Sequence, residues 1–155
     1  MDFCLKVGSE VETLFRAILN DKKFNNSQDI ETDRKNQNIK VYRKYIEPKY
    51  RLSKYNVVVN PIKLEIQPFE NFGKEKYPIW FRIYSKHKHN KIELIKNWNL
   101  IHSLYALGCL LLLVINHPSL DGKAFSRNTI SQRVFNLGSS HPRYVESIAY
   151  LTIGK

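Results

Sequence analysis

Apolar residues recur every three or four positions near the start of the chain and again from residue 92 onward. Such spacing places side chains on one face of a helix, so the first stretch predicts a helix over about residues 3–20. The second period begins at Ile92 and merges into an apolar run that stops before Pro118. We therefore expect a long core helix from Lys91 to Ile115, packed against the first. The apolar positions of the first helix are Val7, Val11, Leu14, Phe15, Ile18 and Leu19.

In the middle of the chain the apolar residues alternate with polar ones instead. Ile62, Leu64 and Ile66 follow a run of three valines and the turn residues Asn60-Pro61. This pattern is typical of two short strands, and it predicts a β-hairpin over residues 55–68. A loop with Pro68, Gly73 and Pro78 then leads into a helix that carries Trp80 and Phe81 and ends near His87 and His89.

The remaining segments have weaker patterns. Residues 21–37 are rich in Asn, Asp, Lys and Gln, which predicts a flexible loop. A short helix follows it and is expected to end before Pro48. Beyond the core helix we expect a weak helical segment from Thr129 to Leu137 and a terminal helix or strand over 144–153. The length and the absence of an internal repeat favour one domain over residues 1–155, mainly α with a small β-hairpin insertion.

Composition indicates a folded chain with an anionic partner. Hydrophobic residues make up 43% of the 155 positions, which excludes a disordered chain, and the net charge of +11 favours nucleic acid. Between Arg34 and Lys54 only Glu47 opposes a series of cations. These cations form either a solvated basic face or part of an RNA-binding surface, for which Arg43 and Lys44 are our candidates.

The sequence favours a cytoplasmic protein. Cys4 and Cys109 form no disulfide framework, and the N-terminal residues lack the basic and apolar regions of a signal peptide. The apolar segment from Leu100 to Ile115 is shorter than the roughly 20 residues that span a bilayer. We therefore expect a core helix and no membrane contact.

The residues with the clearest chemical potential are Arg82, His87 and His89. The arginine precedes the two histidines by five and seven positions. A guanidinium can hold phosphate oxygens, and an imidazole can transfer a proton near neutral pH, so this set could cleave a phosphodiester. The alternative is that both histidines are surface residues stabilised at a helix C-terminus. A zinc site is disfavoured because the two histidines would diverge on a helix and neither cysteine has ligand spacing to them.

The segment from Trp80 to Lys91 also resembles a known family. Its order of Trp80-Phe81, Tyr84-Ser85, Lys88-His89 and Lys91 is similar to the motif of an uncharacterised bacterial branch of the HEPN superfamily. That motif has two aromatic residues, then Tyr-Asn, Lys-His and Arg. Here Ser85 replaces the asparagine and Lys91 the arginine. The resemblance extends loosely over residues 3–115 and implies a HEPN-like helical bundle that often forms a homodimer.

The resemblance implies an RNA-binding domain, with metal-independent endoribonuclease activity in a toxin or phage-defence system. It makes His89 the first candidate for proton transfer, His87 the second and Arg82 the phosphate-stabilising cation, with no metal and no other cofactor. Lys86, Lys88 and Lys91 are expected to contact RNA, and either Glu10 or Glu12 can point inward to orient a basic residue. The rival interpretation is a non-catalytic dimeric interaction or regulatory module, such as one half of a toxin and antitoxin pair.

Overall fold

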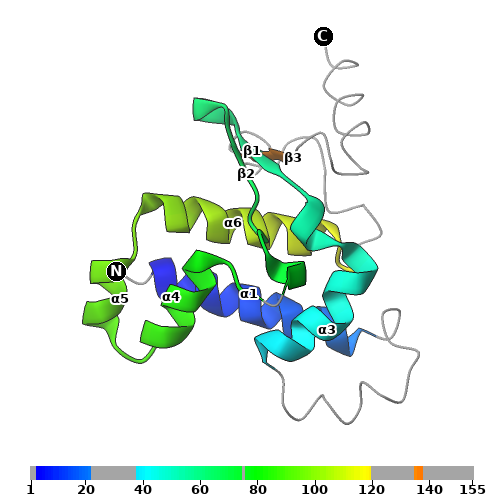
Figure 1. Ribbon diagram of the computed structural model, residues 1–155, viewed down its shortest axis with the longest axis horizontal. Helices are drawn as coiled ribbons and strands as arrows, with labels where there is room; N and C mark the ends of the chain where they lie inside the picture. Colours follow the sequence, from blue (N-terminus) through cyan, green and yellow to red (C-terminus); the bar gives the residue numbers. More distant parts are fainter. Residues whose placement is uncertain (1–2, 22–37, 75, 120–134, 138–155) are drawn as a thin grey trace.

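The chain folds into a mainly helical structure with a small antiparallel hairpin (Figure 1). The computed structural model describes residues 3–21, 38–74 and 76–119 and the backbone of 135–137. The helices are α1 (Phe3–Asn20), α3 (Ile39–Tyr50), α4 (Ile79–His87), α5 (Lys91–Asn97) and α6 (Leu100–Ile115). The strands are β1 (Val57–Val59), β2 (Leu64–Ile66) and β3 (Phe135–Leu137). The predicted fold class, mainly α with a hairpin, is confirmed.

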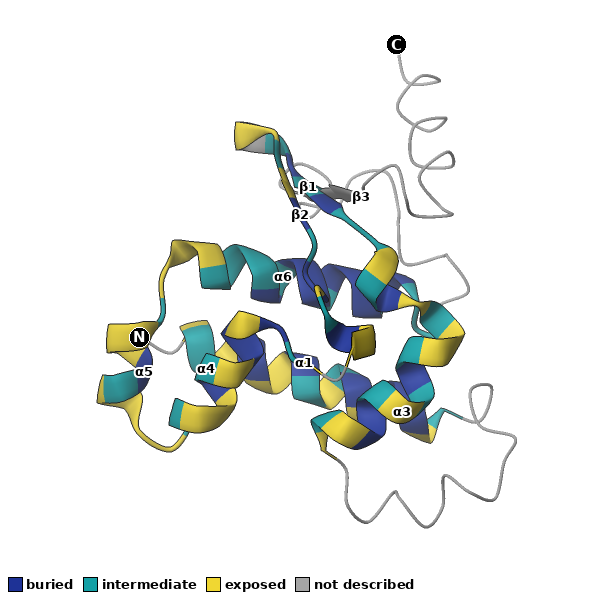
Figure 2. Ribbon diagram, viewed as in Figure 1, coloured by how far each residue is buried: buried dark blue, intermediate teal, exposed yellow. Residues whose placement is uncertain are grey.

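The core lies where α1 packs against α6. Val11, Phe15 and Ile18 of α1 are completely buried, and Figure 2 shows that the buried residues of α6 are concentrated in its C-terminal half. Gly108 of α6 allows a close approach, because a Cβ there would lie only 2.7 Å from Cγ of Pro68. The neighbouring Cys109 is buried and donates its thiol hydrogen to the carbonyl oxygen of Pro68 at 3.3 Å. The loop before α4 is thereby fixed onto α6.

A cluster of aromatic rings joins α1, α3 and this loop. The ring of Phe15 stacks on Tyr42 with centroids 4.8 Å apart, and it also contacts the rings of Phe69 and Phe72. Both loop phenylalanines are buried. The loop that the sequence marked by Pro68, Gly73 and Pro78 is therefore part of the core, and it holds the start of α4 in place.

Helix α3 continues beyond Pro48, so the prediction that it ends before this residue was wrong. Proline removes one backbone donor, which costs a single hydrogen bond when it lies in the last turn. The helix ends instead at Arg51, which adopts a left-handed conformation (φ 51°) and donates its N–H to the carbonyl of Glu47 at 2.7 Å. The Glu47 carboxylate accepts the N–H and hydroxyl of Ser53, which closes the turn that follows.

The expected single helix from Lys91 to Ile115 is in fact two helices, α5 and α6, bent by 100° at their junction. Asn99 begins α6 as its N-cap, and the side chain of Trp98 holds the bend by donating its Nε1–H to Ser103 at 2.8 Å. No single helix in the described segments is long and apolar enough to cross a membrane.

The hairpin pairs Val57 with Ile66 and Val59 with Leu64, within the predicted range 55–68. The opposite edge of β1 pairs with β3, which places residues 135–137 in a strand rather than in the predicted helix. An open strand edge offers backbone hydrogen bonds to any extended segment. The residue pattern of the segment that pairs with this edge does not show that a partner strand is available. The predictions for residues 22–37, 129–134 and 144–153 lie outside the described residues.

Candidate functional site

Helix α4 carries the segment that the sequence singled out. Its apolar side chains Trp80, Phe81 and Tyr84 are buried against the core, whereas Arg82 and Lys86 are exposed. The periodic placement of three large aromatic residues therefore fixes which side of α4 faces solvent. Two pockets adjoin this helix, one beside its first turns and one beside its end.

The larger pocket, which we call the Arg82 pocket, has a volume of about 600 Å³. It lies between the loop before α4, the first turns of α4 and the first turns of α6. Arg82 and Lys76 supply positive charge, and Glu70 is its one carboxylate. The remaining lining residues are Pro68, Asn71, Tyr77, Pro78, Ile79, Trp80, Ile101, His102 and Tyr105. The pocket thus combines apolar walls with an excess of cations.

His102 enters this pocket from α6 and is held in a defined orientation. Asn99 accepts the backbone N–H of His102 at 3.0 Å, and Nδ1 of His102 accepts the backbone N–H of Asn99 at 3.2 Å. A neutral imidazole that accepts at Nδ1 carries its proton on Nε2. Burial lowers the pKa of His102 below its ordinary value of 6.5, which also favours the neutral ring. The Arg82 pocket is therefore lined by a neutral imidazole as well as by a guanidinium.

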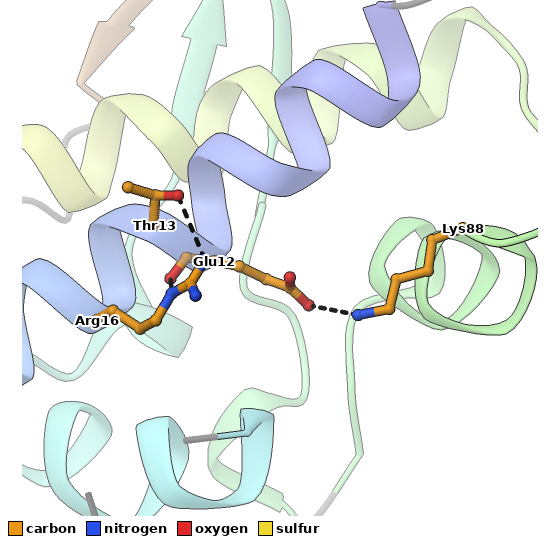
Figure 3. Close-up of polar contacts among 4 residues, drawn as sticks. All are labelled: Glu12, Thr13, Arg16 and Lys88. Carbon is orange, nitrogen blue, oxygen red and sulfur yellow. Dashed lines mark hydrogen bonds and ion pairs between the residues drawn. The ribbon is translucent and has the colours of Figure 1, made fainter. Parts of the chain in front are cut away.

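The second pocket, which we call the His89 pocket, is open and has a volume of about 430 Å³. His89 and Lys88 line it, together with Lys6 and Ser9 of α1. The Nζ atom of Lys88 lies 3.2 Å from Oε1 of Glu12, and Figure 3 shows the Glu12 side chain extending from α1 toward this lysine. Of the two glutamates considered from the sequence, Glu12 is thus the one that orients a basic residue.

Tyr84 completes the wall of the His89 pocket and contacts the same glutamate. Burial, the charge of Glu12 and a hydrogen bond to Glu12 raise the pKa of Tyr84 to about 12. The phenol therefore stays protonated at neutral pH and acts as a donor. The Glu12 carboxylate pairs with Lys88 at the end of α4, while Arg16 donates to the Glu12 backbone carbonyl at 3.4 Å (Figure 3).

The structure brings some of the predicted site residues together and separates others. His89 and Lys88 share a pocket, but Arg82 lines the other one, and His87 is half-buried at the end of α4 and lines neither. Lys86 and Lys91 are exposed. On α3, the guanidinium of Arg43 lies 5.7 Å from the ring centre of Tyr77, and the Lys44 ammonium lies 4.9 Å from that of Tyr45.

Two residues of this region were not found as site residues from the sequence. One is His102, and the signal that could have placed it is the spacing of Asn99 and His102, which matches a helix capping box. The other is Tyr77, which no pattern in the neighbouring sequence marks as a site residue, because its contact with Arg43 joins residues far apart in the chain.

Within residues 3–21, 38–74 and 76–119, no three histidine, cysteine or acidic side chains lie close enough to hold a metal ion. No protein-family profile, curated protein or solved structure matches this chain. The function of the chain is therefore inferred from the side chains of α4 and of the two pockets beside it.

Proposed function

We propose that this protein binds RNA on a basic surface that joins α3 to α4. The observation that carries this proposal is the contact of Arg43 with Tyr77, 5.7 Å from the guanidinium carbon to the ring centre. Tyr77 also lines the Arg82 pocket, so Arg43 of α3 reaches the edge of the pocket that contains Arg82 and Lys76, although the two segments are separate in sequence. Cations that lie near one another are what an RNA backbone requires.

The charge of α4 supports the same function. From Lys76 to Ile92 the chain contains five cations and two histidines but no carboxylate. Lys86 and Lys91 are exposed and free to contact phosphates, whereas Lys88 is half-buried and paired with Glu12. The resemblance of this segment to HEPN domains gives further support, because many of those domains act on RNA.

The proposal predicts salt-dependent binding of single-stranded RNA. Replacing Lys86 and Lys91 together by Gln should weaken binding and reduce the slope of log affinity against log salt by about 0.7 for each lost phosphate contact. Fluorescence anisotropy with a labelled oligonucleotide measures both quantities. The control is Lys63→Gln, which removes an exposed cation outside this surface. A loss with Lys63→Gln equal to that of the double variant, or affinity independent of salt, would contradict the proposal.

A second candidate function is metal-independent RNA cleavage at the His89 pocket. It is favoured by the ion pair with Glu12, which fixes Lys88 in the same pocket as His89. The RNA 2′-hydroxyl would lose its proton to His89 as its oxygen bonds to phosphorus, and the bond to O5′ would break as the leaving oxygen takes a proton from water. Lys88 would stabilise the charge on the phosphoryl oxygens. Arg82 would take part only from a second chain, since it lines the other pocket.

This second function predicts that His89→Ala lowers the cleavage rate by about 10²–10⁴-fold, the usual contribution of one acid or base group, while RNA binding is retained. His117→Ala, outside both pockets, is the control. Cleavage of a defined RNA should continue in excess chelator. Equal rates for the wild type and His89→Ala would reject cleavage at this pocket and leave RNA binding as the function.

A further inference from the structure

Large aliphatic side chains are exposed on α5, at the start of α6 and in the lining of the Arg82 pocket. Leu100 is 75% exposed and Ile92 is 66% exposed, and Figure 2 shows exposed residues over α5 and the first turn of α6. Ile79 and Ile101 are also exposed, and both line the Arg82 pocket. We call this surface the α5–α6 face. It consists of Ile79, Ile92, Ile95, Leu100 and Ile101.

RNA does not account for this face. Nucleic-acid surfaces bind through cations and through aromatic side chains on which bases stack. The exposed residues here are aliphatic, while Trp80 and Phe81 are buried in the core. Several neighbouring exposed aliphatic residues, bordered by charged ones, are typical of a surface that contacts another protein.

The charges around the face indicate the chemistry of that protein. Lys76 and Arg82 lie in the pocket, and Lys91 and Lys96 flank the two isoleucines of α5. On α5 the one carboxylate, Glu93, is already paired with Lys96 at 2.9 Å. Glu70 also lines the pocket, so four cations stand against two carboxylates around these apolar residues, and a complementary partner presents carboxylates around an apolar centre.

A second copy of the chain fits these charges poorly. A two-fold dimer places the same patch on both sides of the contact, so the cations of one copy would face those of the other. The net charge of +11 adds long-range repulsion. Both effects favour a partner of opposite charge over self-association.

We propose that the α5–α6 face binds an acidic amphipathic helix of another protein, with one of its apolar side chains entering the Arg82 pocket. A helix suits the site because side chains at positions i, i+3, i+4 and i+7 form a narrow apolar stripe with charged residues on both sides. The stripe would cover Ile92, Leu100 and Ile101. The flanking carboxylates would meet Arg82, Lys91 and Lys76.

The test uses the full chain and a synthetic helix of about 18 residues, long enough to form several turns. Its leucines occupy the i, i+3, i+4 and i+7 positions and glutamates fill most others. Two control peptides are a scrambled sequence of the same composition and a version with Lys in place of Glu. Isothermal titration calorimetry should show binding of the acidic helix alone. Equal binding of the scrambled or the basic peptide would overturn the proposal.

Two exposed isoleucines provide a matched pair of variants. Ile92→Asp places a negative charge on the face and should raise the Kd of the acidic helix by about tenfold or more, because the helix loses an apolar contact and meets a charge of its own sign. Ile62→Asp introduces the same change at a similarly exposed position, 62%, after β1, and should leave the Kd unchanged. Both variants should keep the circular dichroism spectrum and melting temperature of the wild type, because neither side chain is buried.

Sedimentation of the protein alone separates the proposal from self-association. A monomer that binds the acidic helix supports the proposal. A dimer that Ile92→Asp dissociates would overturn it, because a second copy would then cover the face. Equal Kd values for Ile92→Asp and the wild type would also overturn it, since the helix would be bound elsewhere.

Discussion

Gly8 allows α1 to approach the ring of Tyr84 on α4. A Cβ at this position would overlap the ring, so the residue cannot be enlarged without moving one of the two helices. Tyr84 is also the wall of the His89 pocket and a donor to Glu12. One glycine therefore controls how closely the two helices and their polar contacts can come together.

We expect Gly8→Ala to lower the free energy of unfolding by about 1–3 kcal/mol, the usual cost of overpacking. Alanine gains up to about 1 kcal/mol in helix propensity, which offsets only part of this cost. Chemical denaturation measures the difference. Ser9→Ala, at the exposed neighbouring position, should change stability little. A Gly8→Ala protein as stable as the wild type would show that α1 and α4 separate easily.

Individual residues were predictable where the local pattern determines their environment. The buried positions of α1 follow from spacing, and the exposure of Lys86 follows from its place opposite three aromatic residues. The grouping of site residues was less predictable. Spacing along one helix does not specify the other elements that line a pocket. The separation of Arg82 from His89, and the presence of Arg82 and His102 in one pocket, depend on how the helices pack.

The bend between α5 and α6 is held by a helix cap that includes one titratable side chain, His102. Nδ1 of His102 accepts the Asn99 N–H only while the ring is neutral, because a protonated ring has no acceptor. The pKa of His102 is lowered by burial, so the folded state takes up a proton less readily than the unfolded state, whose pKa is near 6.5. The stabilising contribution is complete above pH 6.5 and is lost as the pH falls from 6.5 through the lower folded-state pKa.

We therefore expect the free energy of unfolding to fall between pH 7.5 and pH 5.5, in part because of His102. His102→Gln keeps an acceptor at this capping position but cannot be protonated, so this variant should lose less stability over the same range. Urea denaturation of both proteins at the two pH values measures the difference. Parallel pH profiles would mean that His102 titrates equally in the folded and unfolded states.

At the level of elements, periodicity predicted the existence of the helices better than their ends. The apolar period continues from α5 into α6, so it conceals a break set by the Asn99 cap. The end of α3 depends on the left-handed conformation of Arg51, a residue with no marked preference for it. Strand β3 forms by pairing with the edge of β1 that β2 leaves open. The two strands are far apart in the sequence, so a pattern read over neighbouring residues cannot reveal this pairing.

At the scale of the whole molecule, the cations Lys76, Arg82 and Lys91 belong to the proposed RNA surface and also border the α5–α6 face. RNA needs them as contacts for phosphates, and an acidic helix needs them as partners for carboxylates. Each ligand neutralises the charges that attract the other, and each occupies space beside the Arg82 pocket. Simultaneous binding would place two anionic ligands side by side, which electrostatic repulsion opposes.

The two proposals together predict competition between RNA and the acidic helix. Adding the synthetic acidic helix to a preformed complex with labelled RNA should release the RNA, and the apparent Kd for RNA should rise in proportion to helix concentration once this exceeds its own Kd. In the Ile92→Asp protein the RNA should remain bound, because the helix has lost its apolar contact while the cations are intact. The Ile62→Asp protein should behave as the wild type. Release of RNA from Ile92→Asp at the same helix concentration would mean that the peptide acts as a general polyanion, and a stable ternary complex would show that the two surfaces are separate.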